Sequence, residues 1–402
     1  MSATTLVDTA PIQAAPARSP MVFGLRKNIV KALLWTRIGW LALRVYKSPQ
    51  RAIAVLRRML AERARSQRFS TRKYARWSGR YFWNFYSPGW PSLAFDRFVE
   101  REMDRIEPFR GAPPALQTAI FAITKRCSLQ CEHCCEWAVL NDRETLSQSD
   151  LRAIVERVCV RGVAQLFLSG GEPLRRFDDL LTIIELASAE ADVWILTSGH
   201  GLSEDRAVRL RSAGLTGVAL SLDHWDAASH DRFRGFEGAY GWVESGAEHA
   251  RRSGLVVTLS LCPTRAFVSR DNLDRYADAA RRLGASFIQI LEPKAVGRYA
   301  GAEVALTTPQ QRLLEEFADR LNTDSRYRDF PAVAYADFTK RSTTCHGAGD
   351  RYIYIDTDGS LHPCPFCRAP VGCALDGDFD TALATLQASG CPAREEEVHP
   401  HG

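Results

Sequence analysis

The sequence predicts an α/β fold built on a parallel sheet. From residue 117 onward, short apolar or β-branched runs alternate with longer stretches of helical periodicity, and this rhythm stops after Phe330. Six strands separated by helices imply right-handed crossovers, with the active face at the carboxyl ends of the strands. The expected strands are 118–124, 165–169, 192–197, 217–222, 255–261 and 285–291. The expected helices are 150–161, 178–190, 204–213, 242–252 and 273–283, followed by one that Thr308 caps and Pro309 opens.

The segment before this pattern is strongly basic. The chain has 402 residues and a formal net charge of +5. Residues 1–112 carry 21 Lys and Arg against 7 Asp and Glu, whereas the other 290 residues carry 31 against 40. Residues 1–20, rich in Ala, Pro and Thr, are expected to be disordered. Helical periodicity covers 22–64 with a break near Ser48 and Pro49, and an aromatic run follows at 81–86.

Two interpretations of residues 22–86 are equally supported. Arg and Lys alternate with Trp, Leu and Ile, as in helices that lie on an anionic membrane surface. The alternative is a basic helical extension packed on the rest of the protein. Nucleic-acid binding is disfavoured, because no known nucleic-acid module accompanies the charge. With no secretory signal and no apolar run long enough to span a bilayer, we expect a cytoplasmic protein, peripheral at the inner face of the membrane under the first interpretation.

Eleven cysteines indicate bound metal. Thiols in the cytoplasm stay mostly reduced, so clustered cysteines there indicate metal or iron–sulfur ligands rather than disulfides. Cys127, Cys131 and Cys134 directly follow the first expected strand. Three thiolates can hold three irons of a 4Fe–4S cluster and leave the fourth iron open to a small molecule. Cys135 is expected to pack beside them, and a zinc knuckle is the alternative interpretation of the triplet.

The Cys-x3-Cys-x2-Cys spacing after the first strand of such a pattern resembles the radical S-adenosylmethionine (SAM) superfamily. A second motif of that family, Gly170, Gly171, Glu172 and Pro173, follows the second expected strand. Weaker matches follow the third and fourth strands. They are Thr197–Ser198–Gly199, with Ser198 where the family usually has Asn, and Ser221–Leu222–Asp223 with His230 and Arg234.

The resemblance covers roughly residues 115–325 and implies a partial (β/α)6 barrel of the radical SAM type. It implies that the three cysteines hold a 4Fe–4S cluster whose open iron binds SAM. One-electron reduction then cleaves SAM to a 5′-deoxyadenosyl radical, which abstracts hydrogen from a substrate. The resemblance further implies that Glu172 meets the amino group of SAM, Ser221 its ribose or methionine portion, and Arg234 its carboxylate. One extra residue between Asp223 and His230 departs from the family pattern.

After Phe330 the chain becomes rich in Gly, Pro and Cys. A hairpin is expected over 352–363, with a turn at 357–359 that would bring Cys364 back toward Cys345. The cysteines of this region resemble those of the SPASM and twitch extensions of radical SAM enzymes, which hold auxiliary iron–sulfur clusters. They are Cys345, Cys364, Cys367, Cys373 and Cys391. Since five cysteines are too few for two clusters, we expect one auxiliary cluster held by four of them, with zinc as the alternative.

These patterns divide the chain into a lead and basic extension (1–112), a radical SAM core (113–330) and an auxiliary-cluster domain (331–402). The expected function is that of a radical SAM oxidoreductase or maturase that takes an electron from an external reductant. A peptide or protein is the first expected substrate, and a membrane-associated lipid or small molecule the second. An iron–sulfur electron carrier or redox sensor without SAM turnover is the alternative from a different class.

Overall fold

The computed structural model describes residues 21–66, 71–109, 116–338, 347, 349, 351–377 and 379–389. The lead at 1–20, predicted to be disordered, lies outside these residues. The largest element is a nine-stranded sheet in the order β10-β9-β8-β7-β6-β5-β4-β11-β12. The six predicted strands form its centre and run parallel, as expected. They are β4 (Thr118–Ala122), β5 (Gln165–Ser169), β6 (Asp192–Thr197), β7 (Gly217–Ser221), β8 (Val256–Leu261) and β9 (Phe287–Ile290).

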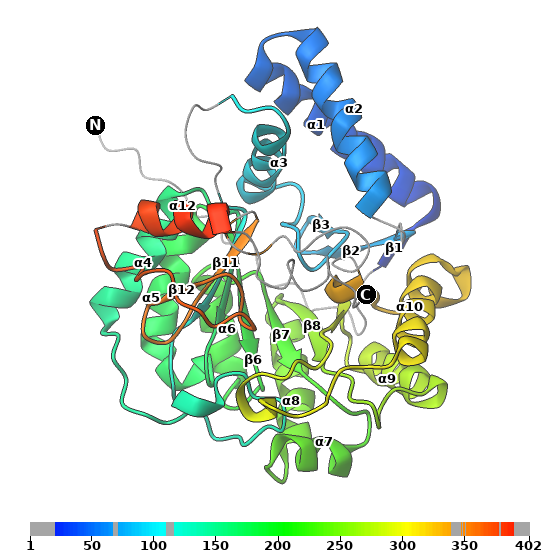
Figure 1. The fold of residues 1–402 in the computed structure, drawn as a ribbon. Helices are drawn as coiled ribbons and strands as arrows, with labels where there is room; N and C mark the ends of the chain where they lie inside the picture. The colour runs from blue at the N-terminus through cyan, green and yellow to red at the C-terminus, as the bar shows by residue number, and fades with distance from the viewer. Residues whose placement is uncertain are drawn as a thin grey trace, which may run out of the picture.

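The sheet continues beyond the six predicted strands. On one side β10 (Ala332–Tyr335) pairs with β9 in parallel, and on the other β11 (Tyr352–Ile355) pairs with β4 in parallel. The predicted hairpin is confirmed, because β11 pairs with β12 (Leu361–His362) in antiparallel fashion. Since β10 and β12 are the two edges, the sheet is an open, partial barrel, as expected (Figure 1). The proposed division at residue 330 therefore separates two sequence patterns, but the sheet crosses it.

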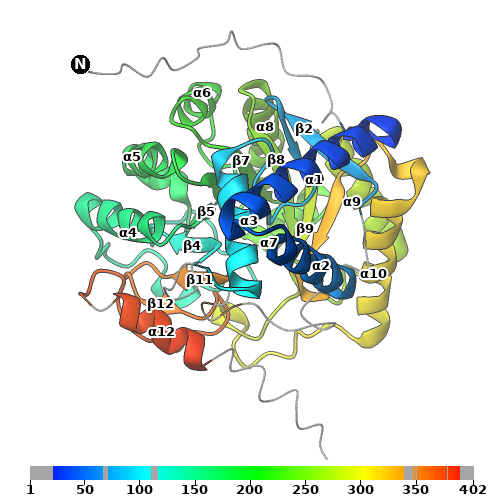
Figure 2. The ribbon, with the colours of Figure 1, turned by 90° about the horizontal axis from the view of Figure 1, so that it is seen from above.

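Helices surround the sheet in a ring (Figure 2). The last of them corrects a prediction: Thr307, not Thr308, is its N-cap, because Gln310 accepts a hydrogen bond from the Thr307 backbone N–H at 3.1 Å and completes a capping box. Helix α7 was not predicted. The helices are α4 (Gln148–Val160), α5 (Phe177–Ser188), α6 (Glu204–Ser212), α7 (Ala227–Arg234), α8 (Ala239–Arg252), α9 (Arg270–Arg282), α10 (Thr308–Thr323) and α12 (Phe379–Ser389).

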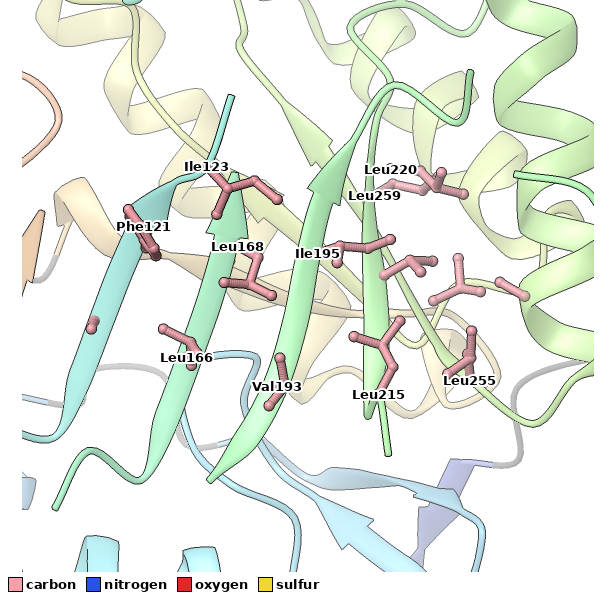
Figure 3. Close-up of a cluster of buried hydrophobic side chains, with 14 of the residues drawn as sticks. Phe121, Ile123, Leu166, Leu168, Val193, Ile195, Leu215, Leu220, Leu255 and Leu259 are labelled. Atoms are coloured by element: carbon pink, nitrogen blue, oxygen red, sulfur yellow. The ribbon is translucent and has the colours of Figure 1, made fainter. Parts of the chain in front are cut away.

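The strands bury both faces. Because side chains alternate along a strand, Leu166 and Leu168 of β5 point outward to the helices, with Val193 and Ile195 of β6 beside them (Figure 3). Phe167 lies on the opposite face of β5 and packs inside the barrel. Two buried faces explain why these strands have near-continuous apolar sequences.

The N-terminal extension is helical, as expected, but it also contains a small sheet that the sequence analysis did not anticipate. Three helices pack together around a buried core that includes Leu41, Val55 and Met103. The helices are α1 (Gly24–Tyr46), α2 (Pro49–Ser66) and α3 (Leu93–Ile106). The antiparallel strands are β1 (Met21–Phe23), β2 (Lys73–Trp77) and β3 (Arg80–Phe82).

This extension closes the amino-terminal mouth of the barrel. Arg80 forms an ion pair with Asp192, the first residue of β6, at 2.5 Å. Gln165, the first residue of β5, donates its side-chain amide to the Phe85 carbonyl at 2.8 Å. Phe85 packs against Trp194 inside the barrel, with ring centroids 5.1 Å apart. Seen from above, α3 lies across the centre of the ring of helices (Figure 2). The extension is therefore packed on the barrel, at the end opposite the carboxyl ends of the strands.

None of the described helices combines the length and the apolar character that crossing a membrane requires.

Candidate active site

The loop after β4 carries the cysteine triplet. Cys127 is held in place because its backbone N–H donates to Asn141 Oδ1 at 2.9 Å. Cys131 is buried and forms a small apolar cluster with Leu129 and Ala239, on which Cys127 and Cys134 also pack. All three cysteines line one cavity. Among the described residues, no three His, Cys, Asp or Glu side chains are already close enough together to hold a metal ion.

The donor set fits an iron–sulfur cluster chemically. Burial raises the pKa of Cys127 to about 11 and that of Cys134 well above its usual range, so both thiols carry protons at neutral pH without metal. Iron binds thiolates, and cluster binding therefore releases these protons. Arg234 donates from Nη1 to Cys131 Sγ at 3.4 Å. A buried guanidinium at this sulfur complements the negative charge of a thiolate-ligated cluster.

The glycine motif packs closely against the cysteine loop. Gly171 donates its backbone N–H to the Thr124 carbonyl at 2.7 Å. Gly170 has φ +130°, and a Cβ there would lie 2.5 Å from that same carbonyl oxygen. A Cβ at Gly171 would collide with the Arg126 carbonyl. Both glycines are therefore required by the close approach of the loops after β4 and β5.

Glu172 is buried beside these loops and is surrounded by donors. Its carboxylate accepts hydrogen bonds from Thr197 Oγ1 at 2.6 Å, from Ser198 backbone N–H at 2.9 Å and from Ser198 Oγ at 2.5 Å. A fourth bond comes from the Leu174 N–H at 3.2 Å. Burial raises the pKa of Glu172 in spite of these bonds. Ser198 lines the cavity, whereas Glu172 and Pro173 lie behind its wall. The contact of Glu172 with the SAM amino group stays a prediction.

Arg234 is buried in an ion pair with Asp223. Burial by itself would raise the pKa of Asp223, but the positive charge of Arg234, together with His133, His230 and the Cys262 N–H, outweighs it and lowers that pKa. His230 accepts the Asp223 backbone N–H at Nδ1, at 3.2 Å, and burial lowers the His230 pKa to about 4, so its ring is neutral. The extra residue before His230 thus does not prevent it from joining Asp223 and Arg234. Arg234, Asp223 and Ser221 all line the cavity.

The cavity has a volume of about 670 Å³ and reaches well beyond the cysteine loop. Tyr352, Pro365 and Phe366 of the C-terminal region form part of its wall. Leu34 and Trp35 of α1, from the N-terminal extension, form another part. Sequence reasoning missed this second contribution, because no motif links a basic helix to a site some hundred residues further along the chain.

Three of the five C-terminal cysteines lie within the described residues. The backbones of Cys364 and Cys367 pair in an isolated antiparallel β-bridge, and the Cys367 N–H donates to the Cys364 carbonyl at 3.2 Å. Gly359, at φ +81°, makes the predicted turn, and a Cβ there would lie 3.6 Å from Cys373 Sγ. Cys345 and Cys391 lie outside the described residues. The choice of the four cysteines that hold an auxiliary cluster stays a prediction.

A buried polar link joins this region to the cysteine loop. Arg368 forms an ion pair with Glu136 at 2.7 Å and donates to the Cys135 carbonyl at 3.3 Å. The hydroxyl of Tyr354 donates to the same Glu136 carboxylate. Glu136 and Arg368 are 232 residues apart, and no spacing in the sequence indicates that they pair.

Comparisons with known proteins agree with this site. The family model described as the radical SAM superfamily matches residues 121–283. The chain is 30% identical over 288 residues to the PqqA peptide cyclase of Ruegeria pomeroyi, covering 69% of this chain and 75% of the relative. It is 28% identical over 297 residues to that of Granulibacter bethesdensis, covering 72% and 76%.

Two solved structures share the fold. One is Streptococcus suis SuiB bound to its precursor peptide SuiA, with a TM-score of 0.55 and 16% identity over 71% of this chain and 69% of that one. The other is anSMEcpe with bound AdoMet, with a TM-score of 0.54 and 18% identity over 67% of this chain and 80% of that one. The motifs, the open barrel and these relatives together show that the chain belongs to the radical SAM superfamily and is a radical SAM enzyme, with a 4Fe–4S cluster and SAM as its cofactors.

Proposed function

We propose that this protein is a peptide-modifying oxidoreductase or maturase. The observation that carries the proposal is one cavity that joins the cysteine loop, the glycine motif and the aromatic wall of the C-terminal region. Its relatives include enzymes named PqqA peptide cyclase, and SuiB of the same fold binds a precursor peptide. A cavity of about 670 Å³ is within the usual range for a small-molecule site, roughly 300–1,000 Å³.

The proposed roles follow the position of each residue. Cys127, Cys131 and Cys134 hold the cluster, and Gly170 and Gly171 let the backbone approach the ligand. Glu172 orients the SAM amino group, with Ser198 fixing its carboxylate, while Ser221 and Arg234 contact the rest of SAM. Cluster and SAM together supply a 5′-deoxyadenosyl radical, once an external reductant gives one electron. The protein's own part is to place SAM and substrate and to exclude water.

The proposal includes one auxiliary iron–sulfur cluster, held by four of Cys345, Cys364, Cys367, Cys373 and Cys391. Such a cluster can accept the electron that remains after hydrogen abstraction from the substrate. We further propose that the protein acts in the cytoplasm, where clustered thiols stay reduced and available to metal. Replacing Cys364 by Ala should spare SAM cleavage and reduce product. Unchanged product from this variant would remove the auxiliary cluster from the proposal.

Deuterium transfer tests the substrate class. The reconstituted, reduced enzyme is incubated with SAM and either the short-peptide fraction or the lipid fraction of cells grown in heavy water. Abstraction moves deuterium from the substrate into 5′-deoxyadenosine, which is read by mass spectrometry. We expect label from the peptide fraction and none from the lipid fraction. Label from the lipid fraction alone would overturn the peptide proposal and support the lipid alternative.

A further inference from the structure

Helix α1 has an exposed apolar face opposite the face that it buries. Five large apolar side chains, each 46–77% exposed, recur at intervals of three, four or seven residues along its length, and we call them the α1 stripe. They are Leu25, Ile29, Leu33, Trp40 and Leu43. At 3.6 residues per turn they fall within a single arc of the helix. The other face of α1, with Leu34, Ile38 and Leu41, is buried on the extension's own core.

Exposed large apolar side chains are concentrated on the N-terminal extension rather than scattered over the protein. Within the described ranges, twelve large apolar side chains are exposed, and eight of them lie between Phe23 and Leu60. Of the remaining four, Leu93 begins α3, and Trp137, Val160 and Phe236 lie singly on the barrel and its loops. Exposed apolar residues are ordinary when scattered, whereas a contiguous row of them marks an interaction surface. Ile53 and Leu60 of α2, which are 50% and 47% exposed, add to the apolar surface of the extension.

The charged side chains of α1, and of α2 as far as residue 61, have a single sign. Residues 21–61 contain nine Lys and Arg and no Asp or Glu. Three of the nine are used inside the fold, because Arg37, Arg44 and Arg51 pair with acidic residues at Asp96, Glu100 and Glu107. Others are exposed to solvent, and these are Arg26, Lys31, Lys47, Arg57 and Arg58. The partner of this surface must therefore be apolar and anionic.

Trp40 shows how the two properties combine. The guanidinium groups of Arg37 and Arg44 lie over its ring, 4.3 and 4.9 Å from the centroid. The indole is thereby held at the surface, 46% exposed, between two cations. Tryptophan beside Arg is characteristic of the membrane–water interface, where an apolar body and a polar edge are both solvated.

We propose that α1 and α2 dock the enzyme on the surface of an anionic lipid bilayer through the α1 stripe and the cations beside it. A second copy of this chain would set one cationic face against another, which the charge disfavours. An interfacial helix, by contrast, needs an apolar stripe to enter the acyl boundary and Lys or Arg to meet anionic headgroups. Docked in this way, the cavity wall formed by Leu34 and Trp35 lies only one helix diameter, about 10 Å, from the lipid.

Flotation of the cluster-loaded full-length protein with lipid vesicles tests the proposal. We expect binding to vesicles that mix phosphatidylglycerol with phosphatidylcholine, weak binding to phosphatidylcholine alone, and weaker binding as salt rises. Leu25→Gln should lower the affinity about tenfold, and Leu25→Gln/Ile29→Gln/Leu33→Gln should remove binding. Arg57→Gln/Arg58→Gln should weaken it by about 25-fold, since each cation contributes about fivefold.

The matched control is Val160→Gln on α4, because Val160 is 84% exposed and lies on the barrel, away from the stripe. It should bind vesicles as the wild type does. Iron content and melting temperature report that each variant is folded. Wild-type binding by the triple variant, or absence of binding to the anionic vesicles, would overturn the proposal. So would a dimer, detected by light scattering, that the triple variant abolishes.

Discussion

The two mouths of the barrel are built on opposite principles. At the carboxyl ends of the strands, short loops carry glycines and cysteines together with the buried charged groups Glu172 and Arg234. At the amino ends, the extension fills the lumen with aromatic rings. Its Arg80 pairs with Asp192 of β6, and its Phe85 carbonyl accepts a hydrogen bond from Gln165 of β5. The first mouth places reactive groups at some cost in buried charge, and the second supplies packing. Substitutions at the two mouths should therefore separate cofactor binding from stability.

The largest expected effect is at the cysteine loop. Cys134→Ala removes a proposed ligand of the SAM cluster, so the purified variant should contain about four iron atoms fewer per chain. Its iron-free form should melt like the wild type's, because the side chain is small and half-buried. Cys159→Ala on α4 is the matched control and should keep its full iron. Equal iron in both variants would show that the triplet is not a cluster site.

The next effect is at the other mouth. Phe82 is 1% exposed and packs edge-on to Trp194, with ring centroids 6.4 Å apart. Phe82→Ala should lower the free energy of unfolding by about 4 kcal/mol, measured by urea denaturation, because it leaves a cavity. Iron content and SAM affinity at low temperature should stay unchanged.

Phe23→Ala serves as the control for this substitution, because Phe23 is 40% exposed, and its cost should not exceed about 0.5 kcal/mol. If Phe82→Ala impaired SAM binding in the folded protein, the two mouths would be coupled rather than separate.

A smaller effect is expected at Glu172. Glu172→Gln removes the negative charge proposed for the SAM ammonium. It keeps one side-chain oxygen, which can accept either from Ser198 N–H and Oγ or from Thr197 Oγ1 and Leu174 N–H, because these pairs of donors bind different carboxylate oxygens. SAM affinity, measured by calorimetry on the cluster-loaded protein, should fall about 30-fold. Glu156→Gln, on the exposed face of α4, should leave it unchanged. Unaltered affinity in Glu172→Gln would place the SAM ammonium elsewhere.

The smallest effect is a pH dependence at the amino-terminal mouth. Burial lowers the pKa of Lys73 to about 7, while its Nζ donates to the carbonyls of Tyr327 and Phe330. Between this pKa and the usual value of 10.5, the unfolded chain binds one more proton than the folded one. The free energy of unfolding should therefore rise with pH inside that window, by about 1.4 kcal/mol for each pH unit.

Urea denaturation of the wild type and of Lys73→Met at several pH values isolates this contribution. The rise should be missing from Lys73→Met. An identical pH profile in the two proteins would mean that Lys73 stays charged when buried.

The contrast between the mouths also explains what the sequence could predict. The central strands follow from local alternation and apolar runs, and the glycine motif from spacing within one loop. The strands β1, β2 and β3 have only three to five residues each. β1 pairs with β2 across a long stretch of chain, whereas the Ser78–Gly79 turn that joins β2 to β3 is a local signal that was overlooked. The addition of β10 and β11 to the sheet was also missed. Each strand has only four residues, so β10 was not recognised although α10 provides its crossover from β9, and β11 pairs with β4 from a distant part of the chain.

The same distinction between local sequence signals and contacts of distant residues applies within the site. Cys127, Cys131 and Cys134 were identified because their ligand spacing lies within eight residues. The ion pair of Arg368 with Glu136, and the wall that α1 gives to the cavity, depend on tertiary contacts and leave no pattern in the sequence. Ser198 shows an intermediate case: it was predicted from a motif, but its hydrogen bonds to Glu172 appear only in the folded chain.

The central claim is that the carboxyl-end mouth cleaves SAM. The most direct measurement is the release of 5′-deoxyadenosine by the anaerobically reconstituted, dithionite-reduced protein, with the deuterated peptide fraction present to supply substrate. We expect release from the wild type and none from Cys131→Ala. No release from wild-type protein that carries a full first cluster, or equal release from Cys131→Ala, would contradict the account.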